Sequence, residues 1–311
     1  MGKLEILNLN QSFPRDDGTR LAVLENISLE VQDEEFVCIL GSSGCGKTTL
    51  LRLIAGLDTA GSGRVILDGE EIRGTSPKVG MVFQEYSLFP WRSVIDNIAF
   101  GLEMRGIAKD ERYRIAERYL NLVNLSQFRT SYPSELSGGM RQRVAIAIAL
   151  SCEPKLLIAD EPTTALDVTI QAQILDLLAR EQRRRHMAMI IITHDLGVVA
   201  GRTDEVAVMY AGRVVERAPT PLLFKNMHMP YTQALLAAIP KIDAAPHTPL
   251  PAISGRPPDP TRPIQGCSFS PRCRYAVARC QVEKPPLTAA ASREHQYACF
   301  HPIGVHAEAG A

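Results

Sequence analysis

The stretch Gly41-Ser42-Ser43-Gly44-Cys45-Gly46-Lys47-Thr48 decides the fold of this 311-residue chain. It fits the pattern G-x-x-x-x-G-K-[ST], in which glycines let backbone N–H groups approach phosphate oxygens and a helix N-terminus adds positive charge. The apolar run Phe36–Leu40 precedes it, and helical apolar spacing follows from Lys47 onward. We predict a phosphate-binding loop with Lys47 on the β- and γ-phosphates and Thr48 on Mg²⁺. The predicted nucleotide-binding residues here are Gly41, Ser42, Gly44, Cys45, Gly46, Lys47, Thr48 and Thr49.

Two carboxylates end the apolar run Leu156–Ala159, which is continuous, as in a buried strand. Asp160 is expected to hold Mg²⁺ from this second strand, and Glu161 to lie beside the γ-phosphate and polarise the attacking water. Adjacent acids also occur at ordinary polar strand ends, but their combination with the loop favours a site that hydrolyses nucleotide. The loop alone is shared by ATPases, GTPases and kinases.

The other apolar patterns predict an α/β fold. Leu4–Leu9 and Ala22–Val31 alternate apolar and polar residues, as half-buried strands do, whereas Ile190–Thr193 is continuous. Two short apolar runs joined by Ala211-Gly212 predict a hairpin. Strands that alternate with helices imply an α/β core. After about residue 220 proline becomes frequent and regular periodicity fades, so we place the end of the main domain there.

Charge and hydropathy exclude several classes of protein. Lys plus Arg and Asp plus Glu both number 34, so the formal net charge is zero and no nucleic-acid partner is expected. The densest basic run, Arg183–Arg185, is typical of a helix C-terminus. No stretch reaches the roughly 18–20 apolar residues of a membrane helix, and no apolar signal core follows Met1. We expect a cytoplasmic protein that reaches a membrane only through a partner.

The stretch Leu136-Ser137-Gly138-Gly139-Met140-Arg141-Gln142-Arg143 resembles the LSGGQ signature of ABC ATPases, with Met where Gln is commonest. Further motifs of that family stand in the right order between residue 1 and about residue 220. They are the aromatic that stacks on adenine, Phe13, the Q-loop glutamine Gln84, the D-loop aspartate Asp167 and the switch histidine His194.

This resemblance implies a P-loop NTPase core of the ABC type with an antiparallel β subdomain and a helical signature subdomain. The ATPase domain is expected at residues 1–220, with the helical subdomain at about residues 85–150. A small cysteine-containing C-terminal extension is expected at residues 221–311.

The resemblance also implies a mechanism shared between two subunits. Ser137-Gly138-Gly139 at a helix start would bind the γ-phosphate of ATP held by a second ABC ATPase subunit, identical or merely similar. Asp167 would cross the interface between them. Gln84 would contact Mg²⁺ or the attacking water, and His194 would donate a hydrogen bond to the γ-phosphate. Together with Glu161, these two residues form the expected catalytic set.

Different parts of the chain resemble two different groups of importer ATPases. Val82–Trp91, continuing through Asn97–Leu102, looks like the ATPases of nitrate, sulfonate and taurine importers. Cys152–Thr169 and Pro230–Leu235 look like those of oligopeptide, dipeptide and nickel importers, with Met229 where that group has His. Both a natural mosaic and an engineered fusion fit this pattern.

The longer match, to the second group, predicts import of peptides or nickel, with nitrate, sulfonate or taurine import as the alternative. Implied partners are two transmembrane permease subunits and an external substrate-binding protein, so the chain would lie on the inner face of the cell membrane. A soluble ABC ATPase acting on nucleic acid or ribosomes is the remote alternative. Such proteins usually carry coiled-coil insertions or two ATPase copies, and neither is evident here.

Four cysteines stand near the C-terminus with the spacing C-x5-C-x6-C-x18-C, namely Cys267, Cys273, Cys280 and Cys299. In a reducing cytoplasm such a group favours metal over disulfides. The segment resembles the C-terminal extension of peptide-importer ATPases, in which some members hold a [4Fe–4S] cluster. We predict that cluster, with Zn²⁺ and no metal as the open alternatives.

Overall fold

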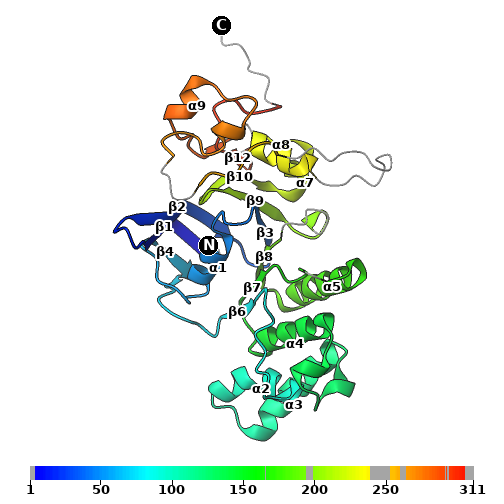
Figure 1. Ribbon diagram of the computed structural model, residues 1–311. Coiled ribbons are helices and arrows are strands. Elements are labelled where there is room, and N and C mark those ends of the chain that lie inside the picture. Colours follow the sequence, from blue (N-terminus) through cyan, green and yellow to red (C-terminus); the bar gives the residue numbers. More distant parts are fainter. Residues whose placement is uncertain are drawn as a thin grey trace.

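The computed structural model describes residues 4–164, 166–193, 199–238, 253–259, 264–290, 292 and 294–304. Two β-sheets form the middle of an elongated molecule, a group of helices forms one end, and the C-terminal segment forms the other (Figure 1). The α/β fold predicted from the sequence is confirmed.

The larger sheet carries the strand that leads into the phosphate-binding loop. Its strands are β3 Phe36–Gly41, β6 Val79–Val82, β7 Leu156–Asp160, β8 Ala188–Ile192, β9 Glu205–Tyr210, β10 Arg213–Pro219, β11 Thr288–Ala289 and β12 Gln296–Tyr297. Their order is β11-β12-β10-β9-β3-β8-β7-β6, with β9, β3, β8, β7 and β6 parallel and the other three antiparallel. Strands β3, β7 and β8 are buried along their whole length, which explains their continuous apolar runs.

The smaller sheet is the predicted antiparallel β subdomain. Its strands, in the order β2-β1-β4-β5, are β1 Leu4–Pro14, β2 Arg20–Val31, β4 Ser62–Leu67 and β5 Glu70–Glu71. Helix α1, Lys47–Ile54, shares one apolar core with both sheets: its Leu50 and Leu51 belong to the same buried cluster as Ile6 of β1 and Ile39 of β3. The helix that begins at the loop is therefore fixed between the two sheets.

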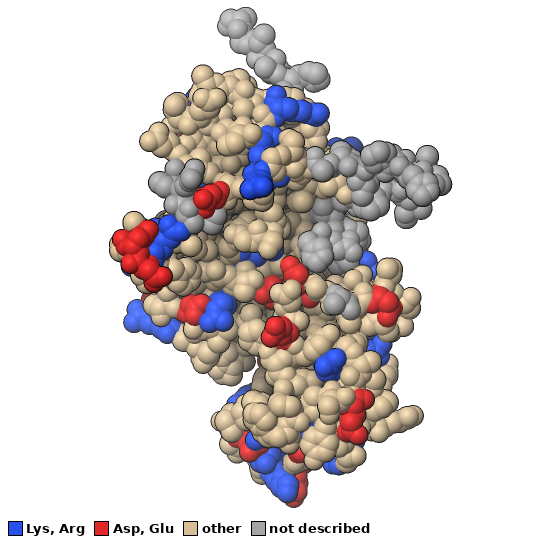
Figure 2. Space-filling view, viewed as in Figure 1, with Lys and Arg blue, Asp and Glu red and all other residues tan. Residues whose placement is uncertain are grey.

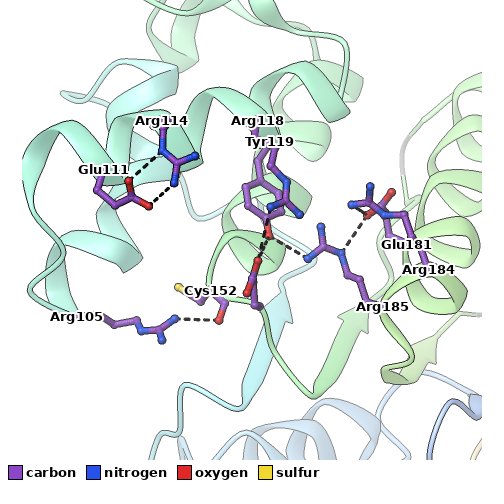
Figure 3. A network of polar contacts seen from close by, with 10 residues as sticks. Arg105, Glu111, Arg114, Arg118, Tyr119, Cys152, Glu181, Arg184 and Arg185 are labelled. Carbon is purple, nitrogen blue, oxygen red and sulfur yellow. Dashed lines mark hydrogen bonds and ion pairs between the residues drawn. The ribbon is translucent and has the colours of Figure 1, made fainter.

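Three helices form the end of the molecule where the sequence predicted a helical subdomain (Figure 1). They are α2 Val94–Met104, α3 Lys109–Leu122 and α4 Gly138–Ser151. Helix α5, Val168–Arg185, lies beside them and ends in the basic run predicted to close a helix. Arg185 joins the two parts by donating to the Tyr119 hydroxyl of α3 at 2.9 Å and to Glu181 of α5 at 3.0 Å (Figure 3).

The C-terminal residues continue the larger sheet, because β12 pairs antiparallel with β10 and β11 with β12. Helices α7 Thr220–Lys225, α8 Pro230–Ala237 and α9 Ala278–Val282 accompany these strands. Although apolar periodicity fades after about residue 220, the chain still forms the helices α7 and α8 there. Both have proline in the first turn, where the missing N–H costs nothing. The domain boundary at residue 220 stays a prediction. The 3₁₀ turns are Ser126–Phe128, Pro133–Glu135 and Ser270–Arg272.

The surface agrees with a neutral protein. On the face drawn in Figure 2, acidic and basic side chains are interspersed over the middle and the helical end, and a short run of basic side chains lies on the C-terminal end. Within the described part of the chain, no helix is both long enough and apolar enough to cross a membrane.

Candidate nucleotide-binding site

The loop between β3 and α1 has the backbone geometry that its glycines predict. Gly44 and Gly46 have φ angles of +76° and +102°, in the region that favours glycine. A Cβ atom on Gly46 would lie 2.7 Å from the Leu24 side chain and 2.9 Å from the Val23 carbonyl oxygen. The loop therefore packs on β2 at a distance that only glycine permits.

A cavity of about 440 Å³ opens over this loop. Its lining residues are Val23, Gly41, Ser43, Gly44, Gly46, Lys47, Thr48, Thr49, Gln84 and Glu161. The fold thus brings the loop together with Gln84, which follows β6, and Glu161, which follows β7. The Lys47 ammonium is buried and donates to the carbonyl oxygens of Gly41 at 2.9 Å and Ser42 at 3.0 Å. Phosphate oxygens entering the cavity would offer Lys47 stronger, charged acceptors.

The two acids at the end of β7 have different surroundings. Asp160 is buried, and burial raises the pKa of its carboxyl above the usual range, while a hydrogen bond from the Thr48 side chain opposes that rise. Glu161 faces the cavity. Its carboxylate accepts hydrogen bonds from the Gln84 amide at 3.4 Å and the Thr164 hydroxyl at 2.9 Å. The positive φ of Glu161, +46°, is uncommon for a non-glycine residue and is typical of functional sites.

The signature stretch begins a helix, as predicted, but it does not border this cavity. Ser137 caps α4 and its hydroxyl accepts from the Met140 N–H at 3.3 Å. Tyr86 links the stretch to the segment after Gln84: a Cβ atom on Gly138 would lie 3.0 Å from its hydroxyl, and the Arg141 guanidinium lies 5.1 Å from its ring centre. Among the described residues that line the cavity, none comes from the signature stretch.

Several other predicted residues also lie outside the described lining. Ser42 and Cys45 belong to the loop, but Cys45 is buried beneath it and the Ser42 N–H is hydrogen-bonded elsewhere. Phe13 lies on β1 and is 39% exposed. Asp167 caps α5, accepting from the Ile170 N–H at 2.9 Å. His194 lies outside the residues that the structure describes. The predicted set missed two lining residues: Ser43, which lies within the loop, and Val23, whose only signal is the alternation of its strand.

The four C-terminal cysteines border a second, small cavity of about 20 Å³. Burial raises the pKa of the Cys267 and Cys273 thiols and raises that of Cys299 to about 12, which disfavours their thiolate forms. Within the described ranges, no group of three or more His, Cys, Asp or Glu side chains is arranged to hold a metal ion. The four cysteines thus border one cavity, no ready-made metal site is seen in this part of the chain, and the metal centre stays a prediction.

Two family models match the chain. One, described as ABC transporter, covers residues 24–164, and the other, described as the oligopeptide/dipeptide transporter C-terminal region, covers residues 215–280. The dimeric post-hydrolysis structure of the ATP-binding cassette MJ0796, bound to ADP and Pi, is 29% identical, with a TM-score of 0.65. It covers 70% of this chain and 98% of that one. The ATPase fold is therefore shared with solved ABC cassettes.

Curated relatives extend the match to the C-terminal segment. A probable peptide ABC transporter ATP-binding protein, y4tS of Sinorhizobium fredii, is 40% identical over 91% of this chain and 86% of its own length. The nitrate import ATP-binding protein NrtD of Synechocystis is 45% identical over 70% of this chain and 79% of its own. The oligopeptide transport ATP-binding protein OppD of Mycobacterium bovis is 41% identical over 96% of this chain. The matched part covers about half of OppD's own length. The chain therefore belongs to the family of ABC transporter ATP-binding proteins and is an ATPase of the importer type.

Proposed function

We propose that this chain hydrolyses ATP to power an importer of oligopeptides or dipeptides, with nickel as the other cargo of that group. The observation that carries the proposal is the oligopeptide/dipeptide C-terminal region, at residues 215–280, on a chain whose ATP cavity gathers Lys47, Gln84 and Glu161. The nitrate-type alternative has support in a relative that matches 70% of the chain, against 91% for the peptide relative above.

Each residue around the cavity would have its own role in ATP binding or hydrolysis. Lys47 would keep its hydrogen bond to the Gly41 carbonyl and turn its other donors to the β- and γ-phosphates, and the loop N–H groups would surround the phosphate oxygens. Glu161 would polarise the attacking water, with Gln84 holding its carboxylate in place. His194 would donate to the γ-phosphate, and Phe13 would stack on adenine. These roles rest on the family resemblance together with the contacts described.

Mg²⁺ fits the oxygen atoms present. The Thr48 hydroxyl and the Asp160 carboxylate are already hydrogen-bonded to each other, and the Gln84 amide borders the same cavity. Hydroxyl, carboxylate and amide oxygens are the ligands that Mg²⁺ prefers. When bound, Mg²⁺ would neutralise charge that develops on the phosphates.

A second copy, or a similar subunit, would complete the site. Ser137, Gly138 and Gly139 present a capped helix start that the chain does not use in its own cavity. A helix start of this kind binds anions. In the dimer that we propose, it would meet the γ-phosphate held by the other subunit, with Asp167 at the interface.

An exposed aromatic residue near the helical end suggests the permease contact. Trp91 is 72% exposed, whereas its neighbour Phe89 is half-buried and packs on Phe100 with ring centres 4.6 Å apart. A tryptophan left this exposed on a folded surface commonly anchors a partner. We propose that Trp91 contacts a helix of the permease. This contact would hold the chain at the inner face of the membrane.

Trp91→Asp is expected to reduce transport at least about tenfold, because interface tryptophans often contribute more than 2 kcal/mol to binding. ATP hydrolysis by the isolated subunit should not change, since Trp91 lies outside the ATP cavity. Val282→Asp is the matched control, because Val282 is 71% exposed on α9, at the opposite end of the molecule. Equal transport by both variants would exclude Trp91 from the permease contact.

A metal centre at the four cysteines belongs to the same proposal. All four border one cavity, yet they are not closed around a single ion, and a [4Fe–4S] cluster needs more widely separated thiolates than Zn²⁺ does. Cluster binding would require loss of the thiol protons, so it would weaken on acidification.

Protein purified without oxygen is expected to be brown, with broad absorbance near about 400 nm. Cys273→Ser should abolish that absorbance, because one of four ligands is lost. Cys152→Ser, which alters a half-buried cysteine in the helical region, should leave it unchanged. A colourless preparation with one zinc per chain would show that the metal is zinc rather than iron, bound by the same four cysteines. Four freely alkylated thiols in the folded protein would reject the metal centre.

The peptide proposal is tested with the chain purified together with its permeases and placed in proteoliposomes. We expect the peptide-loaded binding protein to stimulate ATP hydrolysis, and nitrate or taurine to have no effect. If nitrate, sulfonate or taurine stimulated ATP hydrolysis instead, the chain would be assigned to the nitrate, sulfonate and taurine importers.

A further inference from the structure

Tyr231, in α8 of the C-terminal segment, reaches the phosphate-binding loop. The backbone N–H of Ser42 donates a hydrogen bond to the Tyr231 hydroxyl at 3.0 Å. The Tyr231 side chain is completely buried. A residue 189 positions away in sequence therefore supplies the acceptor for an N–H of the loop that binds phosphate.

One peptide group of the loop is held at both ends by this contact. The carbonyl of Gly41 and the N–H of Ser42 belong to the same planar unit. The carbonyl accepts from the Lys47 ammonium at 2.9 Å, while the N–H donates to Tyr231 at 3.0 Å. Turning this peptide would break both hydrogen bonds, so Tyr231 fixes the direction of the carbonyl that positions Lys47.

Tyr231 is itself immobilised by the larger sheet. Its ring packs on Tyr210 of β9, with ring centres 4.4 Å apart, and on Phe269 at 5.4 Å. The residues that lead into α8 are anchored because the buried Glu216 carboxylate of β10 accepts from the N–H groups of His228 and Met229. The hydroxyl is thus held at one place above the loop.

The start of α8 also faces the C-terminal cysteines. Met229 and Pro230, which precede Tyr231 directly, border the cavity lined by the four cysteines, and so does Phe269. The start of α8 therefore lies between the cysteine cavity and the phosphate-binding loop. The C-terminal segment is in direct contact with the ATP site.

We propose that Tyr231 is a positioning residue for ATP binding, through which the C-terminal segment holds the Gly41–Ser42 peptide in the orientation that the nucleotide requires. The inference rests on the proposed binding of ATP at this loop. Without the hydroxyl, the half-buried Ser42 N–H loses its acceptor, and the free loop relaxes toward other conformations. ATP must then restore the binding geometry, so affinity falls.

The test compares Tyr231→Phe with Tyr210→Phe. Both variants remove one hydroxyl from the same aromatic cluster and keep the ring, but the Tyr210 hydroxyl accepts from Arg272 at 3.2 Å, not from the loop. Calorimetric titration should show Mg-ATP binding about tenfold weaker for Tyr231→Phe and unchanged for Tyr210→Phe. The kcat at saturating ATP should stay within about twofold, because Glu161 and Gln84 are untouched.

Hydrogen exchange gives a second measurement, and its first part uses only the unmodified protein. In the unmodified, ATP-free protein the Ser42 amide should be protected, and in Tyr231→Phe it should exchange faster. Rapid exchange in the unmodified protein, or equal loss of ATP affinity in both variants, would overturn the proposal. Failure of the unmodified chain to bind ATP would instead reject the ATP site on which the proposal rests.

Discussion

Glu161→Gln is expected to lower ATP hydrolysis by about a hundredfold to ten-thousandfold while ATP binding remains, because only the charge that polarises the attacking water is removed. The amide is isosteric and can still accept from Thr164, which now contacts the carboxylate at 2.9 Å. Steady-state phosphate release measures the loss, and titration with Mg-ATP measures the retained binding.

Two further results are expected of this variant. Trapped ATP should hold two subunits together, so light scattering should report twice the 34.2 kDa mass of the chain, or a pair with the similar subunit when that is supplied. Glu117→Gln is the control, since that acid forms a half-exposed ion pair with Arg129 at 3.1 Å on the helical end. If Glu161→Gln hydrolysed ATP as fast as the Glu117→Gln control, Glu161 would not be the residue that polarises the attacking water.

Lys47→Met should weaken ATP binding by about thirtyfold to several thousandfold, because removing one partner of a buried, hydrogen-bonded charge pair costs about 2–5 kcal/mol. Methionine keeps most of the apolar length of the side chain, so the loop should still pack on β2. The change removes the cation and leaves the Gly41 and Ser42 carbonyls without their donor. Calorimetric titration of Mg-ATP measures the effect.

Lys78→Met is the matched control for Lys47→Met. Lys78 forms an ion pair with Glu70 at 2.6 Å, but both side chains are exposed and such pairs contribute about 0–1 kcal/mol. ATP affinity should therefore be unchanged. If both variants bound ATP equally well, Lys47 would not be a phosphate ligand.

The sequence was most informative where chemistry is local. The loop at Gly41–Thr48 could be predicted because its N–H groups, its lysine and its helix start are consecutive residues, and strand burial before it is visible as an apolar run. The same holds for Asp160 and Glu161 at the end of β7. The start of helix α4 was predicted from the resemblance of Leu136–Arg143 to the signature, and the structure shows that Ser137 caps it.

Contacts between distant segments could not be predicted. Nothing in the residues around Tyr231 indicates that its hydroxyl meets Ser42, because that contact depends on how α8 packs against β9 and β10. Strands β11 and β12 have two residues each, too few to show a period. Phe13 was predicted from resemblance alone and does not border the described cavity of the single chain.

The central claim is tested most directly by measuring the uptake of a labelled oligopeptide by the host cell. The chromosomal gene carries the Glu161→Gln change in one strain and the Glu117→Gln control change in another, and the two strains are compared. We predict that oligopeptide or dipeptide uptake through this system, or nickel uptake, falls to the level of a deletion strain, while nitrate, sulfonate and taurine uptake are unchanged. Undiminished peptide and nickel uptake together with lost nitrate, sulfonate or taurine uptake would contradict the account.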